Sequence, residues 1–523
     1  MAERLTVKVE RFGPTPPLVK RAGQQLLRNA AVRGALNGGE HRLLAVRLLD
    51  PPRKTREPKE PSRVRATIYD YGENRTITVE ADLADLDKVD VRESAWQPNP
   101  STDEFEAAVA VLKDEPGLGE AIRSGKLVPY PPMPPLVHAE LPEGNAERTV
   151  TVGLLPEGQA SGHEIVGVNL GRREVTRFAG GAPATALAAD AVCGVPVAAD
   201  QQTANRGAPG QAWVTVKRGN TVLWRFLAVR PAASSGRDGS GVELRYVDYR
   251  GRRVLHQAHV PILNVRYGNN ACGPYRDWQW QEGKILAPGR NVAPGFRLCP
   301  APAQTIMQSH TDTGDFLGVG IYVAGDEVVL VSELEAGWYR YVSEWRLHAD
   351  GTIRPRFGFA AVSSSCVCKK HFHHVYWRFD FDIGTPGRNR VREFNDPPLT
   401  TGGPQWHTIR FETKRMRPPR HKRRWRVENA AGRAYAIRPG ANDRTVAGDA
   451  YAKGDLWILR YRPGQIDDYP ITATEAELDK LVNHESVVDQ DVVVWYAAHF
   501  THDVHSHSGV GHVIGPELVP INW

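Results

Sequence analysis

The sequence has few cysteines and no long apolar run. Only 5 of its 523 residues are cysteine, and this small, odd number argues against a framework of disulfides. No apolar run approaches the roughly 18 residues that a membrane-spanning helix needs. The first residues, MAERLTVKVERFG, lack the apolar core of a signal peptide. These absences predict a cytoplasmic protein without a membrane-spanning segment.

Charge of one sign is not in strong excess either. The formal net charge is +6, with 24% charged and 41% hydrophobic residues, which is an ordinary composition for a globular protein. Such a mild excess does not by itself indicate nucleic-acid binding. A basic run at residues 414–426, KRMRPPRHKRRWR, is interpreted as a solvated loop. We therefore expect neither a membrane nor nucleic acid among the partners.

Helical patterns are confined almost entirely to the first part of the chain. Two small units, residues 1–58 and 59–140, each mix helix and strand patterns. In the first unit, the pattern predicts a helix over residues 17–37. In the second, a helix is expected to begin after an N-cap at Ser101 or Thr102. In residues 141–523, short runs rich in valine, isoleucine and aromatic residues alternate with turns. This texture is typical of a large antiparallel β-sandwich. We expect a mainly β protein in which two small α+β domains precede the sandwich.

One predicted strand combines histidines with carboxylates. Residues 370–383, KHFHHVYWRFDFDI, are rich in aromatic and β-branched residues. His371 and His373 would share one face, and Asp380 and Asp382 the opposite face. Paired imidazoles suit copper, zinc, iron or nickel, whereas paired carboxylates suit calcium. Alone, an H-x-H is equally compatible with a half-buried strand that carries solvated histidines.

Three blocks in the C-terminal third resemble segments of the copper-containing amine oxidases. The H-x-H followed by RFDFDI resembles the family's copper-binding strand. Residues 489–502, DQDVVVWYAAHFTH, resemble its last copper-ligand segment, and residues 424–429 with 434–440, RWRVEN and AYAIRPG, resemble the segment between them. The resemblance extends from about residue 15 to the end of the chain. It implies the family's sandwich fold and a divergent member of the family.

The resemblance also implies a set of copper ligands. These are His371, His373 and His502, the last preceded by the threonine that the family's pattern has. Three imidazoles hold Cu(II) while leaving positions for water and oxygen. His505 and His507 follow closely, and either could bind copper in place of His502. The alternative for the whole segment is a solvated histidine-rich loop.

Residues 334–345, LEAGWYRYVSEW, resemble the segment that carries the family's topaquinone. Tyr339 would be the quinone precursor, although Trp338 and Arg340 replace the family's asparagine and acidic residue. The alternative that Tyr339 is an unmodified tyrosine of the core therefore stays open. Upstream, the resemblance implies Asp277 as the catalytic base, with a surface turn residue as the alternative. Tyr267 would hydrogen-bond the quinone oxygen.

A calcium site and a cysteine pair complete the candidates. The resemblance implies peripheral calcium at Asp380, Asp382 and Asp491, with a salt-bridged carboxylate cluster as the alternative. Cys366 and Cys368 match no family feature. A C-x-C beside an H-x-H suits soft Cu(I), but two reduced thiols on a strand are our preferred interpretation.

The function implied by the resemblance is oxidation of a primary amine with O2 and water to an aldehyde, ammonia and hydrogen peroxide. Its cofactors are copper and topaquinone, its substrate is a small-molecule or peptide amine, and the protein would be a homodimer. Two alternatives stay open. One is a quinone-free copper protein or oxidase of the same fold that acts on another substrate. The other is a binding or scaffold protein that has lost the chemistry.

Overall fold

The structure is a computed structural model of the chain. It describes residues 3–49, 54–95, 97–98, 100–131, 147–157, 164–177, 193–196, 210–231, 241–265, 281–364, 367–368, 370–445, 454–463, 475–502 and 512–523.

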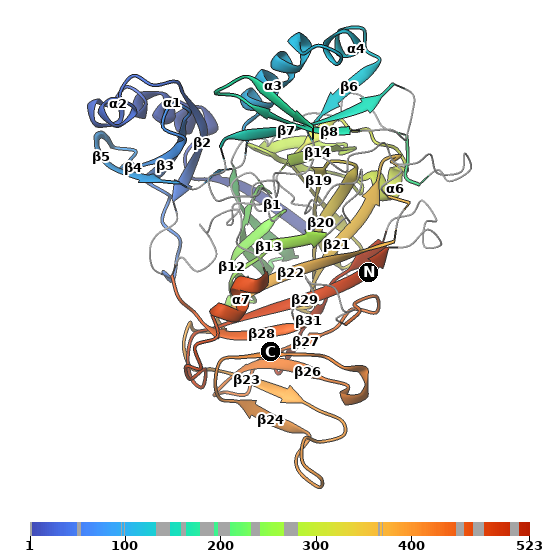
Figure 1. The fold of residues 1–523 in the computed structure, drawn as a ribbon. Helices are drawn as coiled ribbons and strands as arrows, with labels where there is room; N and C mark the ends of the chain where they lie inside the picture. Colours follow the sequence, from blue (N-terminus) through green and yellow to red (C-terminus); the bar gives the residue numbers. More distant parts are fainter. Residues whose placement is uncertain are drawn as a thin grey trace.

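Two large sheets form the body of the molecule (Figure 1). The first has nine strands, in the order β1 (Leu5–Phe12), β10 (Gln211–Arg218), β11 (Thr221–Val229), β12 (Glu243–Tyr249), β13 (Arg252–Val265), β22 (His371–Phe381), β29 (Val492–His502), β28 (Leu456–Arg460) and β25 (Thr413–Arg415). Each described neighbour pair in this sheet is antiparallel. The mainly β fold class predicted from the sequence is thus confirmed.

The second sheet has 14 strands. Its main path is β15 (Arg290–Ala293), β16 (Phe296–Leu298), β18 (Val319–Ala324), β19 (Glu327–Ala336), β20 (Tyr339–His348), β21 (Ile353–Ala361), β31 (Glu517–Ile521), β27 (Ala434–Arg438), β26 (Arg424–Asn429), β23 (Asn389–Phe394) and β24 (Trp406–Ile409), with β14 (Gln281–Ile285), β17 (Phe316–Leu317) and β30 (His512–Ile514) beside it. Strands β16 and β18 pair in parallel.

The main core joins residues of both large sheets. Val375, Trp377 and Phe379 of β22 belong to the same buried cluster as Tyr341 and Trp345 of β20. These three residues of β22 alternate along the strand, as the sequence pattern predicted. The side chains between them on β22 face the other side of the sheet. There Tyr376 belongs to a second buried hydrophobic cluster, to which α7 (Glu475–Lys480) contributes Leu478. One face of β22 therefore points into the sandwich and the other points away from it.

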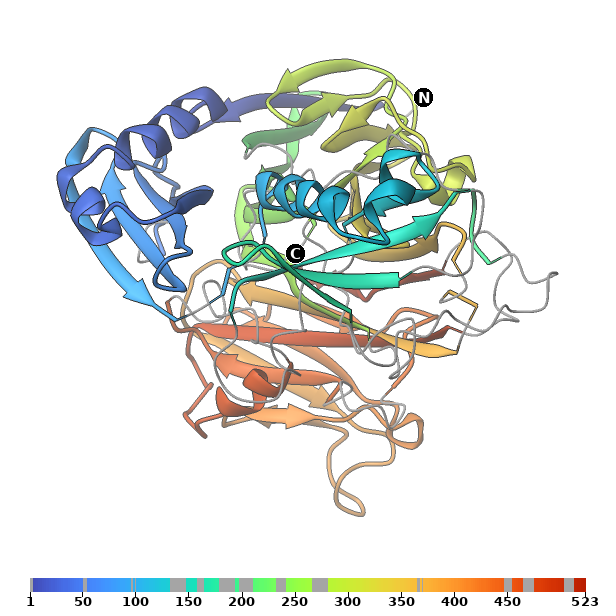
Figure 2. The same cartoon turned by 45° about the horizontal axis from the view of Figure 1, so that its top comes forward.

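The two small units each consist of helices on a four-stranded sheet. The first contains α1 (Pro16–Leu26), α2 (Ala30–Leu36), β2 (His41–Leu49), β3 (Arg63–Asp70), β4 (Arg75–Asp82) and β5 (Asp85–Ser94). The second contains α3 (Thr102–Asp114), α4 (Gly119–Arg123), β6 (Leu127–Tyr130), β7 (Thr149–Pro156), β8 (Glu164–Asn169) and β9 (Glu174–Arg177). In Figure 2 the first unit lies at one side of the molecule, whereas the helices of the second lie over the sandwich.

The observed units differ from the predicted boundaries. The boundary at residues 58 and 59 falls between β2 and β3, which are paired neighbours in one sheet. The second unit continues past residue 140 to β9, and β1 belongs to the sandwich. The predicted boundary falls within a charged, Pro-rich connector, residues 51–61, and this connector joins two adjacent strands of one sheet. Composition reveals a break in regular structure without revealing which strands pair across it.

Local signals place the helices. Ser101 and Glu104 form a capping box that begins α3, as predicted. The helix predicted for residues 17–37 is instead two helices, because the side chain of Asn29 accepts from the amide of Ala31 and begins α2. Other short helices in the described part of the chain are α6 (Ile306–Ser309) and the 3-10 helix η3 (Pro419–His421). Within the described ranges, none of the helices is long and apolar enough to cross a bilayer.

Candidate metal centre

Three histidines meet on the inner face of β22 and β29. His371 lies directly opposite His502 in the antiparallel register, and His373 follows two residues along the same face of β22. One ring nitrogen from each of the three side chains lies within 4.8 Å of the others. All three side chains are buried. The structure thus brings together the three residues that were predicted to bind copper.

The environment of His373 fits a metal ligand. Both of its ring nitrogens are buried and have no hydrogen-bond partner among the described residues. Burial, and then the neighbouring histidines, lower the pKa of His373 well below its ordinary value. The imidazole is therefore neutral, which is the form that binds metals. A buried imidazole without a partner is costly, and a metal ion bound by the three rings would remove that cost.

Tyr339 points into the histidine cluster. Its hydroxyl lies 2.7 Å from Nε2 of His371 and 3.0 Å from Nδ1 of His502. The side chain is only 1% exposed. The tyrosine directly follows the two-residue turn between β19 and β20, whose first central residue, Gly337, has φ 58°. A positive φ at that position is what a type II′ hairpin turn requires, and glycine adopts it without strain.

Aromatic rings enclose this cluster. The rings of Tyr339 and Tyr341 are stacked, with centroids 5.2 Å apart and planes 1° apart. The ring centroid of His373 lies 4.7 Å from that of Phe359 and 5.8 Å from that of Phe500. Side chains packed in this way limit ring rotation and exclude water. The geometry therefore offers three nitrogen donors and one phenolic oxygen in a rigid site of low polarity.

The side chain of Arg340, which follows Tyr339 on β20, lies outside the histidine cluster. The side chain of Arg340 points to the opposite face of the sheet, where it donates to both carboxylate oxygens of Asp312 at 2.8 and 3.1 Å. The same guanidinium donates to the carbonyl oxygens of Gly337 at 2.9 Å and Tyr339 at 3.1 Å. Trp338 is 3% exposed within the main core. Arg340 thereby holds the backbone of the turn that presents Tyr339.

Two further buried carboxyls accompany Arg340. Glu335 lies 3.6 Å from the guanidinium, and Glu333 accepts a hydrogen bond from the amide of Ile306 at 2.8 Å. Burial raises the pKa of each carboxyl to about 8. The positive charge of Arg340 opposes this rise in both cases. These carboxyls therefore bind protons at a neutral pH, although sequence reasoning gave them no role.

Comparisons with known proteins bear on the fold of the chain. No protein-family model matches the sequence, and no curated protein matches it. Among solved structures, Aspergillus nidulans amine oxidase matches with TM-score 0.58 and 13% identity, over 100% of this chain and 90% of that one. Pichia pastoris lysyl oxidase matches with TM-score 0.57 and 13% identity, over 100% and 92%. A copper-containing benzylamine oxidase from Hansenula polymorpha matches with TM-score 0.55 and 12% identity, over 99% and 94%.

The chain has the copper amine oxidase fold. The match runs over nearly the whole chain, so the two small units and the sandwich together correspond to this fold. At such low identity the likeness shows the fold alone. The chemistry of the site depends on the buried histidines and their surroundings.

Several candidate residues named from the sequence are not placed by the structure. Tyr267, Asp277, His505, His507 and Cys366 lie outside the described residues. His499, on the same strand as His502, faces the outer side of the sheet, where its Nδ1 lies 2.9 Å from Nδ1 of His374.

The prediction of two reduced thiols beside the histidines is wrong for Cys368. This cysteine forms a disulfide with Cys193, which lies 175 residues earlier in the chain. Its partner belongs to a short segment that pairs with the end of β21, at Val362. Cysteine number and spacing do not reveal such a bond, since it depends on tertiary proximity. Among the described cysteines, Cys299 is a buried free thiol.

The predicted calcium ligands also come together, but around a lysine. Asp380, Asp382 and Asp491 each place an oxygen within 4.8 Å of the others. The ammonium of Lys54 lies 2.5, 3.0 and 2.6 Å from oxygens of these three residues, in that order. Burial raises the pKa of Asp382 and of Asp491, while the lysine opposes the rise. The structure thus contains the salt-bridged cluster that was the alternative to calcium.

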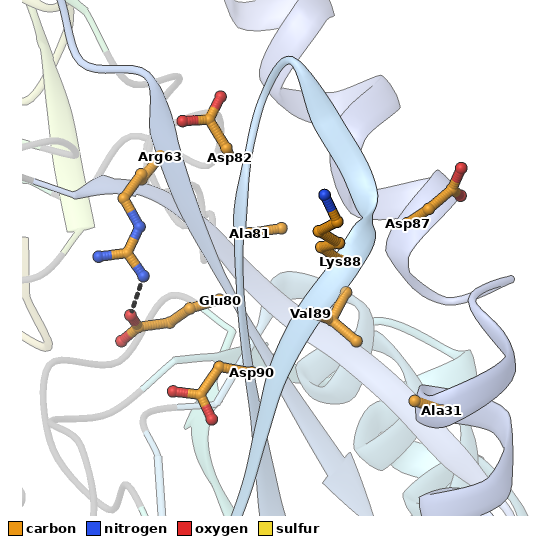
Figure 3. A pocket seen from close by; sticks show the side chains of 9 residues that line it. All are labelled: Ala31, Arg63, Glu80, Ala81, Asp82, Asp87, Lys88, Val89 and Asp90. Carbon is orange, nitrogen blue, oxygen red and sulfur yellow. Dashed lines mark hydrogen bonds and ion pairs between the residues drawn. The ribbon is translucent and has the colours of Figure 1, made fainter.

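Other charged regions lie apart from the histidine cluster. A hollow of about 540 Å³ lies in the first small unit. Figure 3 shows the side chains that line it, with the ion pair between Arg63 and Glu80. In the basic run at residues 414–426, Lys414 lies 2.7 Å from Asp479, and other cations pair similarly. The run includes β25, η3 and β26, so it is not simply a solvated loop.

Proposed function

We propose that the protein is a copper-dependent primary-amine oxidase. It would convert a primary amine, O2 and water into an aldehyde, ammonia and hydrogen peroxide. The observation that carries this proposal is the position of the Tyr339 hydroxyl, within 3.0 Å of ring nitrogens of both His371 and His502 in a buried cluster. The amine oxidase fold supports the same conclusion.

The roles of the residues follow from their places. His371, His373 and His502 would hold copper, which supplies redox chemistry for oxidising the ring of Tyr339 to topaquinone and for reducing O2. The histidines orient the Tyr339 hydroxyl through its two hydrogen bonds. The aromatic rings around them exclude water. From the resemblance, Asp277 would take a C–H proton from the substrate, and Tyr267 would hydrogen-bond the quinone oxygen.

Phenylhydrazine titration of the copper-loaded protein in air tests this function. We expect a new visible absorption band at one equivalent per chain, because an electrophilic quinone carbonyl reacts with the hydrazine. Tyr339→Phe should abolish the band while copper still binds. Tyr435→Phe is the matched control, since this buried tyrosine donates to the carbonyl of Gly351, away from the cluster. If Tyr339→Phe retained amine oxidation, the mechanism would be refuted.

A quinone-free copper protein or oxidase of the same fold is the second candidate. The observation that favours it is the pair Trp338 and Arg340, which replaces the residues flanking the quinone precursor in the segment it resembles. Its signature would be one copper per chain, no phenylhydrazine band, and an unmodified tyrosine mass for the peptide containing Tyr339. Failure to bind copper at all would instead favour a binding or scaffold protein.

A further inference from the structure

We propose that the ammonium of Lys54 takes the place of a divalent cation among Asp380, Asp382 and Asp491. The protein would then bind no calcium at this cluster, and the lysine would fasten the first small unit to the sandwich. This inference concerns a site outside the histidine cluster, so it holds or fails independently of the proposed oxidase activity.

The ammonium fills the position where an ion would sit. It lies 2.5 to 3.0 Å from one oxygen of each of the three aspartates. Calcium binds oxygens at about 2.3–2.6 Å, so an ion at this centre would overlap with the nitrogen. An ammonium has three N–H donors, and three carboxylates match that number. The two cations are therefore alternatives that exclude each other.

The lysine is buried deeply enough to behave as part of the site. Its side chain is 7% exposed, and those of Asp380 and Asp382 are 0% and 3% exposed. The nitrogen also lies 4.2 Å from the ring centroid of Tyr461, an arrangement that favours a cation. Buried carboxylates this close together repel one another unless a cation lies between them. Lys54 supplies that charge from within the chain.

The position of Lys54 in the chain gives the contact a second consequence. Lys54 belongs to the connector between β2 and β3 of the first unit, which reaches toward the sandwich in Figure 1. Neighbouring connector residues also contact the sandwich: the hydroxyls of Thr55 and Tyr246 are 3.2 Å apart, and Arg253 donates to the carbonyl of Arg56 at 3.0 Å. The connector is thus attached at three successive residues.

The aspartates lie on or directly beside the two strands that carry the candidate copper ligands. Asp380 is at the opposite end of β22 from His371, and Asp491 directly precedes β29, which ends at His502. The ammonium therefore joins the first unit to both strands at once. Removing it would leave buried carboxylates facing one another, which is strongly destabilising.

Calcium binding to the copper-loaded protein tests the proposal. We expect the unaltered protein to contain no calcium by elemental analysis and to show the same Tm in calcium-free buffer and in millimolar Ca²⁺. Lys54→Ala should lower Tm by roughly 5 °C in calcium-free buffer. Millimolar Ca²⁺ should restore at least half of that loss, with one Ca²⁺ bound per chain by calorimetry. Lys88→Ala, which removes a lysine whose side chain is 89% exposed, is the matched control and should show no calcium response.

Three results would overturn the proposal. The first is one equivalent of calcium bound by the unaltered protein and lost in Asp382→Asn. The second is a Lys54→Ala protein with unchanged Tm in calcium-free buffer. The third is a destabilised Lys54→Ala protein that binds no calcium, since a carboxylate cluster open to a divalent ion is part of the proposal. If Lys54→Ala does not fold, the calcium measurement on the unaltered protein decides alone.

Discussion

Trp338 and Arg340 flank the candidate quinone precursor, and their effects differ at the scale of single residues. Arg340 points away from the histidine cluster because successive side chains of a strand alternate between its faces. It forms a bidentate ion pair with Asp312 and binds the backbone of the turn before Tyr339. Trp338 is packed into the core. Neither replacement prevents the hydroxyl of Tyr339 from contacting the histidines.

Glu335 gives a pH-dependent prediction at the same scale. Its pKa is raised from an ordinary 4.5 to about 8 in the folded protein, so the folded state binds more protons than the unfolded state between these values. The contribution of this carboxyl to stability is therefore fully present below about 4.5 and is lost as the pH rises through about 8. Glu335→Gln removes the titrating carboxyl, and its urea midpoint should exceed that of the unaltered protein at pH 9 but not at pH 5.

We expect the gain at pH 9 to be on the order of 1–3 kcal/mol. Glu106→Gln, on the exposed face of α3, is the control and should leave the pH dependence unchanged. An equal effect of Glu335→Gln at both pH values would mean that the carboxyl does not change its protonation over this range.

At the scale of elements, β22 and β29 place the candidate copper ligands through their register alone. A shift of one residue between them would move His502 away from His371 and turn it to the other face. The tight turn between β19 and β20 then delivers Tyr339 from the second sheet. The cluster therefore needs both sheets, and no single element contains it.

The disulfide between Cys193 and Cys368 constrains the segment before β22, only three residues from His371. Replacing both cysteines with serine should lower stability by about 2–4 kcal/mol, because a long loop in the unfolded chain is no longer closed. Urea unfolding without reductant measures this, and a reductant should bring the unaltered protein to the same midpoint. Cys299→Ala, at the buried free thiol, should leave the response to reductant intact.

Peptide masses before and after reduction check the bond directly. A Cys193 peptide that is not linked to Cys368 before reduction would show that the pairing does not form. Disulfides persist mainly in oxidising compartments, so the cytoplasmic location stays a prediction that fractionation of the source cells would measure.

At the scale of the whole molecule, the amine oxidase fold combines two small units with one large sandwich (Figure 1). A buried ion pair between Glu104 and Arg148 stabilises the second unit. Nε of Arg148 lies 2.8 Å from Oε1 of Glu104, and Nη2 lies 2.7 Å from Oε2. That pair connects the start of α3 with the start of β7. The first unit has the Lys54 connection in addition to its own core.

The homodimer implied by the resemblance is a prediction for the whole molecule. Light scattering on the eluting peak of a gel-filtration run should give twice the mass of the chain, and the peak should not change on dilution to micromolar concentrations. Copper removal should leave the dimer intact, since the histidine cluster is formed within one chain. A mass of one chain at all concentrations would contradict the dimer.

The sequence by itself determined the β-rich class, the strand that carries His371 and His373, and the candidate Tyr339. The class and the strand depend on local alternation over a few residues, whereas Tyr339 is implied by the resemblance of residues 334–345 to a segment of the family. Only the tertiary structure decided that Cys368 pairs with Cys193, that Arg340 pairs with Asp312, and that residues 51–61 connect two strands of one sheet. It also decided that Lys54 meets aspartates more than 300 residues away. Such contacts depend on which strands pair across the sheets, and the spacing of residues along the chain does not contain that information.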